Sequence, residues 1–170
     1  MRQFKFEFMN DFKMSFGGSL LSGKRKNALA LSTRNPIHLI LKTSGHKFFG
    51  PGNKSLERLV FDHASKYKIR IHRLSLNWSH IHMIIQIPSR QAYKSFIRTL
   101  TAAIVIAVSK AKGSVLKGIF DLRPFTRILS WGRDFKNVMA YHDLNDLEAR
   151  GYIRRPNKKT SRNKKPQKPP

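Results

Sequence analysis

The stretch KIRIHRLSLNWSHIHMIIQIP, from Lys68 to Pro88, decides the fold. It holds two runs rich in β-forming residues that meet around Asn77, which is the pattern of an antiparallel hairpin. Successive side chains of a strand point to opposite faces of a sheet, so His80 and His82 lie on the same face. The opposite face of the second run is predicted to be core because it is entirely apolar: Ile81, Met83, Ile85 and Ile87.

Helices are predicted on both sides of this hairpin. Asn53 suits an N-cap, and apolar residues then recur at helical spacing as far as Tyr67. Ser89 suits a second N-cap, and the apolar series that follows it stops by Gly113. A buried strand is predicted over 36–43, separated from the first helix by the turn sequence GPG.

The remaining part of the fold is predicted as a strand over 124–131 and a helix over 132–150, with Gly151 as the C-cap. The order of elements is then β-α-β-β-α-β plus a C-terminal helix. This order is typical of the ferredoxin-like α+β arrangement, in which an antiparallel sheet carries two helices on one face. The terminal helix is an addition to that arrangement.

Length and composition divide the chain into three parts. Its 170 residues fit one domain, which we place at 36–152. Residues 1–35 are interpreted as a flexible basic arm because 17–35 are rich in Gly, Ser and basic side chains; no role is assigned to 1–16. Residues 153–170 carry eight basic and four proline residues and no acidic one, which predicts a disordered basic tail.

The charge of the chain points to a partner rich in phosphates. Lys and Arg number 34 against 9 Asp and Glu, a net charge of +25, so nucleic acid is the leading candidate. An anionic membrane is the rival, but the longest apolar run, 102–108, is far short of the roughly 18 residues needed to span a bilayer. The absence of cysteine excludes disulfides and thiolate zinc sites, and we expect a cytoplasmic protein without a secretory peptide.

The histidine pair has two readings. His80 and His82 project side by side, with backbones roughly 6 to 7 Å apart, so they are either polar residues on a wet sheet face or two ligands that converge on a metal ion. His38 and His72 lie in neighbouring predicted strands, and nothing in their spacing requires them at the site. His142 is expected to point away, because it lies about 100° around the helix from its neighbour Tyr141.

The terminal helix carries a polar stripe. Tyr141 and Asn145 are four residues apart and share one helical face with Asn137 and Glu148. The ordinary interpretation is a surface tyrosine among solubilising neighbours. The stripe becomes functional if it faces the histidines, and Glu148 is then the acidic residue best placed to assist the site. Asp134, in the first turn, fits compensation of the helix dipole instead.

Taken in order, these motifs resemble the HUH-type single-strand DNA transposases, and among them the REP-associated tyrosine transposases. The resemblance covers roughly 17–152. It rests on the HXH pair of the central strand, the tyrosine of the last helix, and the polar residue four positions after it. The segments that carry it are GGSLLSGKRK, STRNPIHLILK, LSLNWSHIHMII, GIFDLRPFTRILSW and AYHDLNDLEARG.

The resemblance implies a role for each matching residue. His80 and His82 would be metal ligands, Asn145 a third ligand through its amide oxygen, and Tyr141 the nucleophile, with Glu148 as a possible accessory. It also implies single-stranded DNA with hairpins as the substrate, magnesium or manganese as the cofactor, and a covalent 5′-phosphotyrosine intermediate in transposition or repeat processing. Where family members often have Asn-His before the first ligand, this chain has Trp-Ser.

Contacts to the DNA backbone are expected from basic residues in two places: Lys24, Arg25 and Lys26 in the arm, and Arg123 and Arg127 at the last strand. The sequence leaves open whether the tyrosine acts within its own chain or across a homodimer. The alternative function is a non-catalytic or degenerate nucleic-acid-binding protein that recognises hairpins. Composition alone favours that alternative, whereas the tyrosine and the histidine pair favour the enzyme.

Overall fold

The computed structural model describes residues 15–18, 29–43, 47–120 and 123–154. Its strands and helices are, in chain order, β1 (Ser15–Phe16), β2 (Ile37–Lys42), α2 (Lys54–Lys66), β3 (Arg70–Asn77), β4 (His80–Gln86), α3 (Arg90–Lys112), β5 (Phe125–Ile128) and α4 (Arg133–Ala149). The strands form one antiparallel sheet in the order β1-β5-β2-β4-β3. Without the short β1, this is the strand order of a ferredoxin-like sheet, so the predicted α+β arrangement is confirmed.

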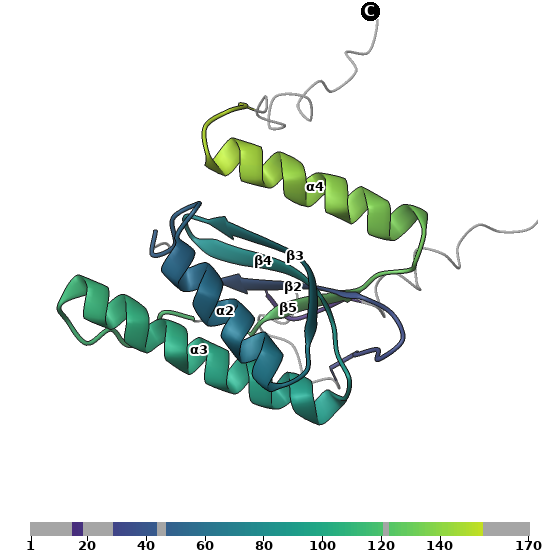
Figure 1. The fold of residues 1–170 in the computed structure, drawn as a ribbon, viewed down its shortest axis with the longest axis horizontal. Coiled ribbons are helices and arrows are strands. Elements are labelled where there is room, and N and C mark those ends of the chain that lie inside the picture. The colour runs from purple at the N-terminus through teal and green to yellow at the C-terminus, as the bar shows by residue number, and fades with distance from the viewer. Residues whose placement is uncertain (1–14, 19–28, 44–46, 121–122, 155–170) are drawn as a thin grey trace, which may run out of the picture.

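The sheet lies between two layers of helices. Helices α2 and α3 cover one face, and α4 crosses the other face (Figure 1). The first two helices begin where their caps predict, because the side chain of Asn53 accepts a hydrogen bond from the Leu56 amide and that of Ser89 from the Ala92 amide. Gly113 ends α3 in a left-handed conformation, with φ of 66°.

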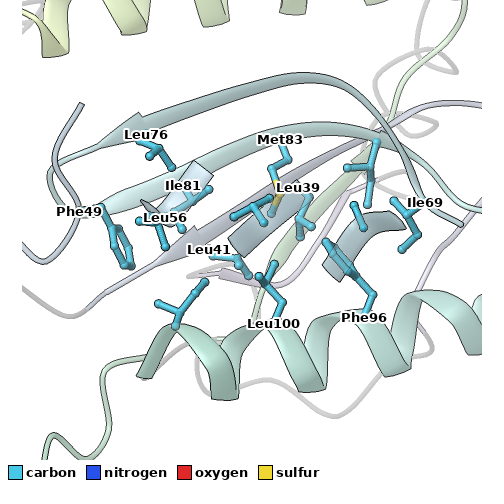
Figure 2. Close-up of a cluster of buried hydrophobic side chains, with 14 of the residues drawn as sticks. Leu39, Leu41, Phe49, Leu56, Ile69, Leu76, Ile81, Met83, Phe96 and Leu100 are labelled. Carbon is cyan, nitrogen blue, oxygen red and sulfur yellow. The ribbon is translucent and has the colours of Figure 1, made fainter. Parts of the chain in front are cut away.

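The main core fills the space between the sheet and helices α2 and α3 (Figure 2). Every residue predicted for the core face of the second hairpin strand is at most 1% exposed. Helix α3 is long and apolar enough by composition to cross a membrane. In this structure the apolar residues of one face of the helix pack into the core: Tyr93, Phe96, Leu100, Ile104 and Val108.

Strand β1 was not predicted, and it lies within the segment interpreted as an arm. Ser15 pairs with Arg127 and Phe16 with Thr126, so the strand extends the sheet beyond β5. Gly17 follows with φ of 88°, and a Cβ at this position would lie 2.0 Å from the carbonyl oxygen of Pro124. Only glycine therefore fits this approach without a shift of the backbone.

Helix α4 is held to the second face of the sheet by a small apolar cluster. Ile84, Leu129 and Val138 are its buried members, and Phe135 and Met139 pack against them. Two ion pairs join the helix to the strands beneath it: Arg73 with Asp143, and Arg127 with Asp134 at 2.8 Å. The helix ends one residue earlier than predicted, because its C-cap is Arg150 and the expected C-cap, Gly151, follows it at φ of 82°.

Candidate metal centre and tyrosine helix

The two histidines of the hairpin lie on the central strand β4, on the face that α4 covers. Their ring centroids are 4.5 Å apart, so the pair does share one face. His82 is buried, with 4% of its surface exposed. His80 is half-buried at the start of the strand, where its Nδ1 lies 3.1 Å from the hydroxyl of Ser79.

A third histidine reaches the site from the neighbouring strand β2. His38 pairs with Ile84 across the ladder, which brings its ring alongside that of His82. The two rings stack with centroids 5.5 Å apart, and His38 Nε2 lies 3.3 Å from His82 Nδ1. The sequence left the position of His38 open; the strand register decides it.

The fourth histidine of the site corrects an expectation. His142 was expected to point away from the site, yet it is fully buried, with its ring centroid 5.0 Å from that of His38 and 5.3 Å from that of His82. Helix α4 lies with Val138, His142 and Asn145 against the sheet, so the buried stripe is centred on His142 and not on Tyr141. One ring nitrogen from each of His38, His82 and His142 can be chosen so that all lie within 4.8 Å of one another, close enough to hold a metal ion.

Burial keeps these three imidazoles neutral at neutral pH. Desolvation is the main cause in each case: it lowers the pKa of His38 to about 3, that of His82 to about 2 and that of His142 to about 4. Repulsion between charged forms adds to the effect, because a protonated His38 would face a protonated His142, and a protonated His82 a protonated His80. A protonated His142 would face the guanidinium of Arg73. A neutral imidazole keeps the lone pair with which it binds a metal.

His142 carries a further sign that the site accepts another group. Both of its ring nitrogens are buried and neither makes a hydrogen bond. A buried polar atom without a partner costs roughly 1 to 3 kcal/mol, so native proteins seldom retain one unless a water or ion completes it. The donor set fits a divalent cation, because imidazole nitrogens are common metal ligands.

Tyr141 lies at the edge of the site. Its ring centroid is 6.3 Å from that of His82, and 45% of its surface is exposed. Asn145, one turn later, is buried with 7% exposed, so the structure brings both residues to the histidine face of the sheet. Glu148 is exposed near the end of the helix. The tyrosine is therefore beside the histidines and still reachable from solvent.

The predicted phosphate contacts lie in three different settings. Arg127 projects near His38, where its charge lowers the pKa of that imidazole, and it is also bound by the carboxylate of Asp134. Arg123 is exposed just before β5. The three basic residues at 24–26 lie outside the described residues.

Comparisons with known proteins give a structural likeness without a sequence match. Neither a scan of protein-family profiles nor a search of curated proteins matched this chain. Among solved structures, a REP-associated tyrosine transposase bound to a REP hairpin superposes with a TM-score of 0.60 at 14% identity, covering 76% of each chain. A candidate transposase from Deinococcus radiodurans R1 gives a TM-score of 0.46 at 12% identity, covering 72% of this chain and 97% of the other. The chain thus has the fold of a REP-associated tyrosine transposase.

Proposed function

We propose that this protein is a metal-dependent DNA strand transferase that cleaves and rejoins single strands through Tyr141. The observation that carries the proposal is the docking of the tyrosine helix over the histidine strand, with the Tyr141 and His82 rings 6.3 Å apart. This arrangement occurs in a fold shared with a REP-associated tyrosine transposase. A protein that only binds nucleic acid needs neither a nucleophile nor a cluster of neutral histidines.

The chemistry follows from the residues at the site. The Tyr141 oxygen attacks the phosphorus of a phosphodiester, and the bond to the leaving 3′ oxygen breaks. The tyrosine proton is lost to a base or to water, and the leaving oxygen takes up a proton from water. The products are a 5′-phosphotyrosine and a free 3′-hydroxyl, so the energy of the broken ester is kept for rejoining. A bound divalent cation, held by the histidines with Asn145 as the resemblance implies, would withdraw charge from the phosphate oxygens.

The substrate we propose is hairpin-forming single-stranded DNA. The relative with the same fold is bound to a REP hairpin. The net charge of +25 suits a partner with many phosphates, and we assign part of that attraction to the basic arm and tail at 1–35 and 153–170. The exposed side of Tyr141 supports this proposal, because a polymer can reach a nucleophile only at the surface.

The test is a covalent adduct. The protein is incubated with labelled single-stranded hairpin DNA and manganese or magnesium, and the mixture is denatured and separated on a gel. We expect a protein–DNA adduct that requires the cation and is lost in Tyr141→Phe. Tyr152→Phe is the matched control, because Tyr152 is also exposed near the C-terminus, and it should form the adduct normally.

The opposite outcome has a defined meaning. If the protein binds hairpins tightly but forms no adduct with any of them, it is a binding protein and the strand-transfer reaction is wrong. If Tyr141→Phe still forms the adduct, another residue is the nucleophile.

A further inference from the structure

The histidines that cluster in the structure differ from the metal ligands that the family resemblance implies. The inference drawn from this difference rests on the proposed function. The resemblance implies two imidazoles from one strand and an amide. The structure instead gathers His38, His82 and His142 from β2, β4 and α4. We propose that these three histidines hold the metal ion, and that the centre prefers zinc or cobalt(II) to magnesium.

The spacing of the nitrogens supports this assignment. With metal–nitrogen bonds of 2.0 to 2.1 Å, two ligands of a tetrahedral zinc ion lie about 3.3 Å apart. His38 Nε2 and His82 Nδ1 are 3.3 Å apart, which matches that edge. The nitrogens chosen from the three rings lie within 4.8 Å of one another, so the His142 ring has to move closer to the other two to complete the triangle.

His142 also has the strongest reason to gain a partner. It is 0% exposed, and both of its ring nitrogens are without a hydrogen bond. An imidazole in that state is destabilising unless a further group completes it. A cation bound by His142 would coordinate one of these nitrogens, so that nitrogen would no longer be a buried polar atom without a partner. The ligand set that the resemblance implies does not include His142 and leaves both nitrogens without one.

The charges around the cluster favour a nitrogen-preferring cation. The two nearby carboxylates are already engaged, Asp134 by Arg127 and Asp143 by Arg73. Three imidazoles without a carboxylate suit zinc and cobalt, whereas magnesium prefers oxygen ligands. Three protein ligands also leave a fourth tetrahedral position for water or a phosphate oxygen, as in catalytic zinc centres.

His80 has a different place in this arrangement. It is half-buried at the start of β4 and bonded to Ser79, and its pKa is lowered first by burial and then by the nearby ammonium of Lys42. Its position at the mouth of the site, beside His82, suits a contact with substrate. His80 therefore distinguishes the two ligand sets, because it is a ligand in one and not in the other.

The experiment is a cobalt titration of the metal-free full-length protein without DNA. We expect one ion per chain, d–d absorption bands typical of tetrahedral cobalt, and displacement by zinc but not by magnesium. His38→Ala and His142→Ala should each weaken binding by at least about tenfold. His80→Ala should bind as wild type does, and so should the control His63→Ala, whose imidazole is bonded to the Leu59 carbonyl on α2.

A second measurement avoids the chance that a buried variant fails to fold. In the wild-type cobalt complex, proton NMR should show hyperfine-shifted N–H signals from three imidazoles. Two such signals, or loss of binding in His80→Ala and Asn145→Ala but not in His142→Ala, would overturn the three-histidine set. No binding of cobalt or zinc would overturn it as well. The adduct assay with Tyr141→Phe is independent, so strand transfer with manganese can stand if this ligand set fails.

Discussion

The attachment of α4 to the sheet is expected to be the weakest part of the folded domain, and one pair of substitutions tests this. Ile84 and Ile85 are neighbours on β4, both 0% exposed, with side chains on opposite faces. Ile85 belongs to the large core under α2 and α3, whereas Ile84 belongs to the cluster of three buried residues that holds α4. Ile84→Ala and Ile85→Ala thus remove the same atoms from two different contacts.

The expected magnitudes follow from burial. An isoleucine-to-alanine change in a packed core costs about 2 to 5 kcal/mol. Each of the three buried residues under α4 contributes about 1.5 to 3 kcal/mol, before the entropy of ordering the helix is subtracted. Losing Ile84 therefore removes a large share of the docking free energy. A loss of only 2 kcal/mol raises the population of the undocked helix about 30-fold.

Native-state hydrogen exchange measures the difference. In Ile84→Ala, exchange of the amides in α4 should accelerate by about 30-fold or more while α3 keeps most of its protection. In Ile85→Ala, both helices should lose protection together, because the loss falls on the shared core. Equal acceleration of α3 and α4 in Ile84→Ala would refute the reasoning and show that α4 unfolds only with the whole domain. Adduct formation should also fall in Ile84→Ala, since the tyrosine is carried by this helix.

Three other predictions concern stability and binding. In metal-free protein, folding lowers the pKa values of His38, His82 and His142, so the unfolded state binds more protons than the folded state below about pH 6.5. As the pH falls below that value, the free energy of unfolding measured in urea titrations should decrease by up to about 4 kcal/mol per pH unit. A free energy of unfolding that does not change with pH would contradict neutral buried imidazoles. Deleting 154–170 should weaken binding to all DNA sequences alike and flatten its salt dependence in a filter-binding assay; a change in which sequence is cut would show a specific role. Gly17→Ala should detach β1 and lower the melting temperature; an unchanged melting temperature would contradict a contribution of β1 to stability.

The order of elements could be predicted because its signals are local. Alternation of side chains defined the hairpin, and caps at Asn53, Ser89 and Gly113 bounded two of the helices. Strand β1 could not be predicted, because its two residues show no periodicity and owe their conformation to pairing with β5. Because β1 is stabilised by pairing with β5, its own sequence needs no β-strand pattern.

The site was predictable only where it depends on a single element. That His80 and His82 share a face follows from the period of a strand. The position of His38 at the site depends on the order of the strands and on the register that pairs it with Ile84. Neither is encoded in the spacing of histidines along the chain, and a cluster drawn from three elements needs both.

The rotation of α4 about its own axis explains why His142 was missed and Tyr141 still fits. The predicted stripe placed Asn137, Tyr141, Asn145 and Glu148 on one face, but the buried stripe is Val138, His142 and Asn145. The apolar Val138, packed with Ile84 and Leu129, draws that face onto the sheet and carries His142 in with it. Tyr141, about 100° around the helix, is left at the margin, near His82 and open to solvent. A buried histidine cluster with an exposed tyrosine beside it would suit the proposed attack on a long polymer.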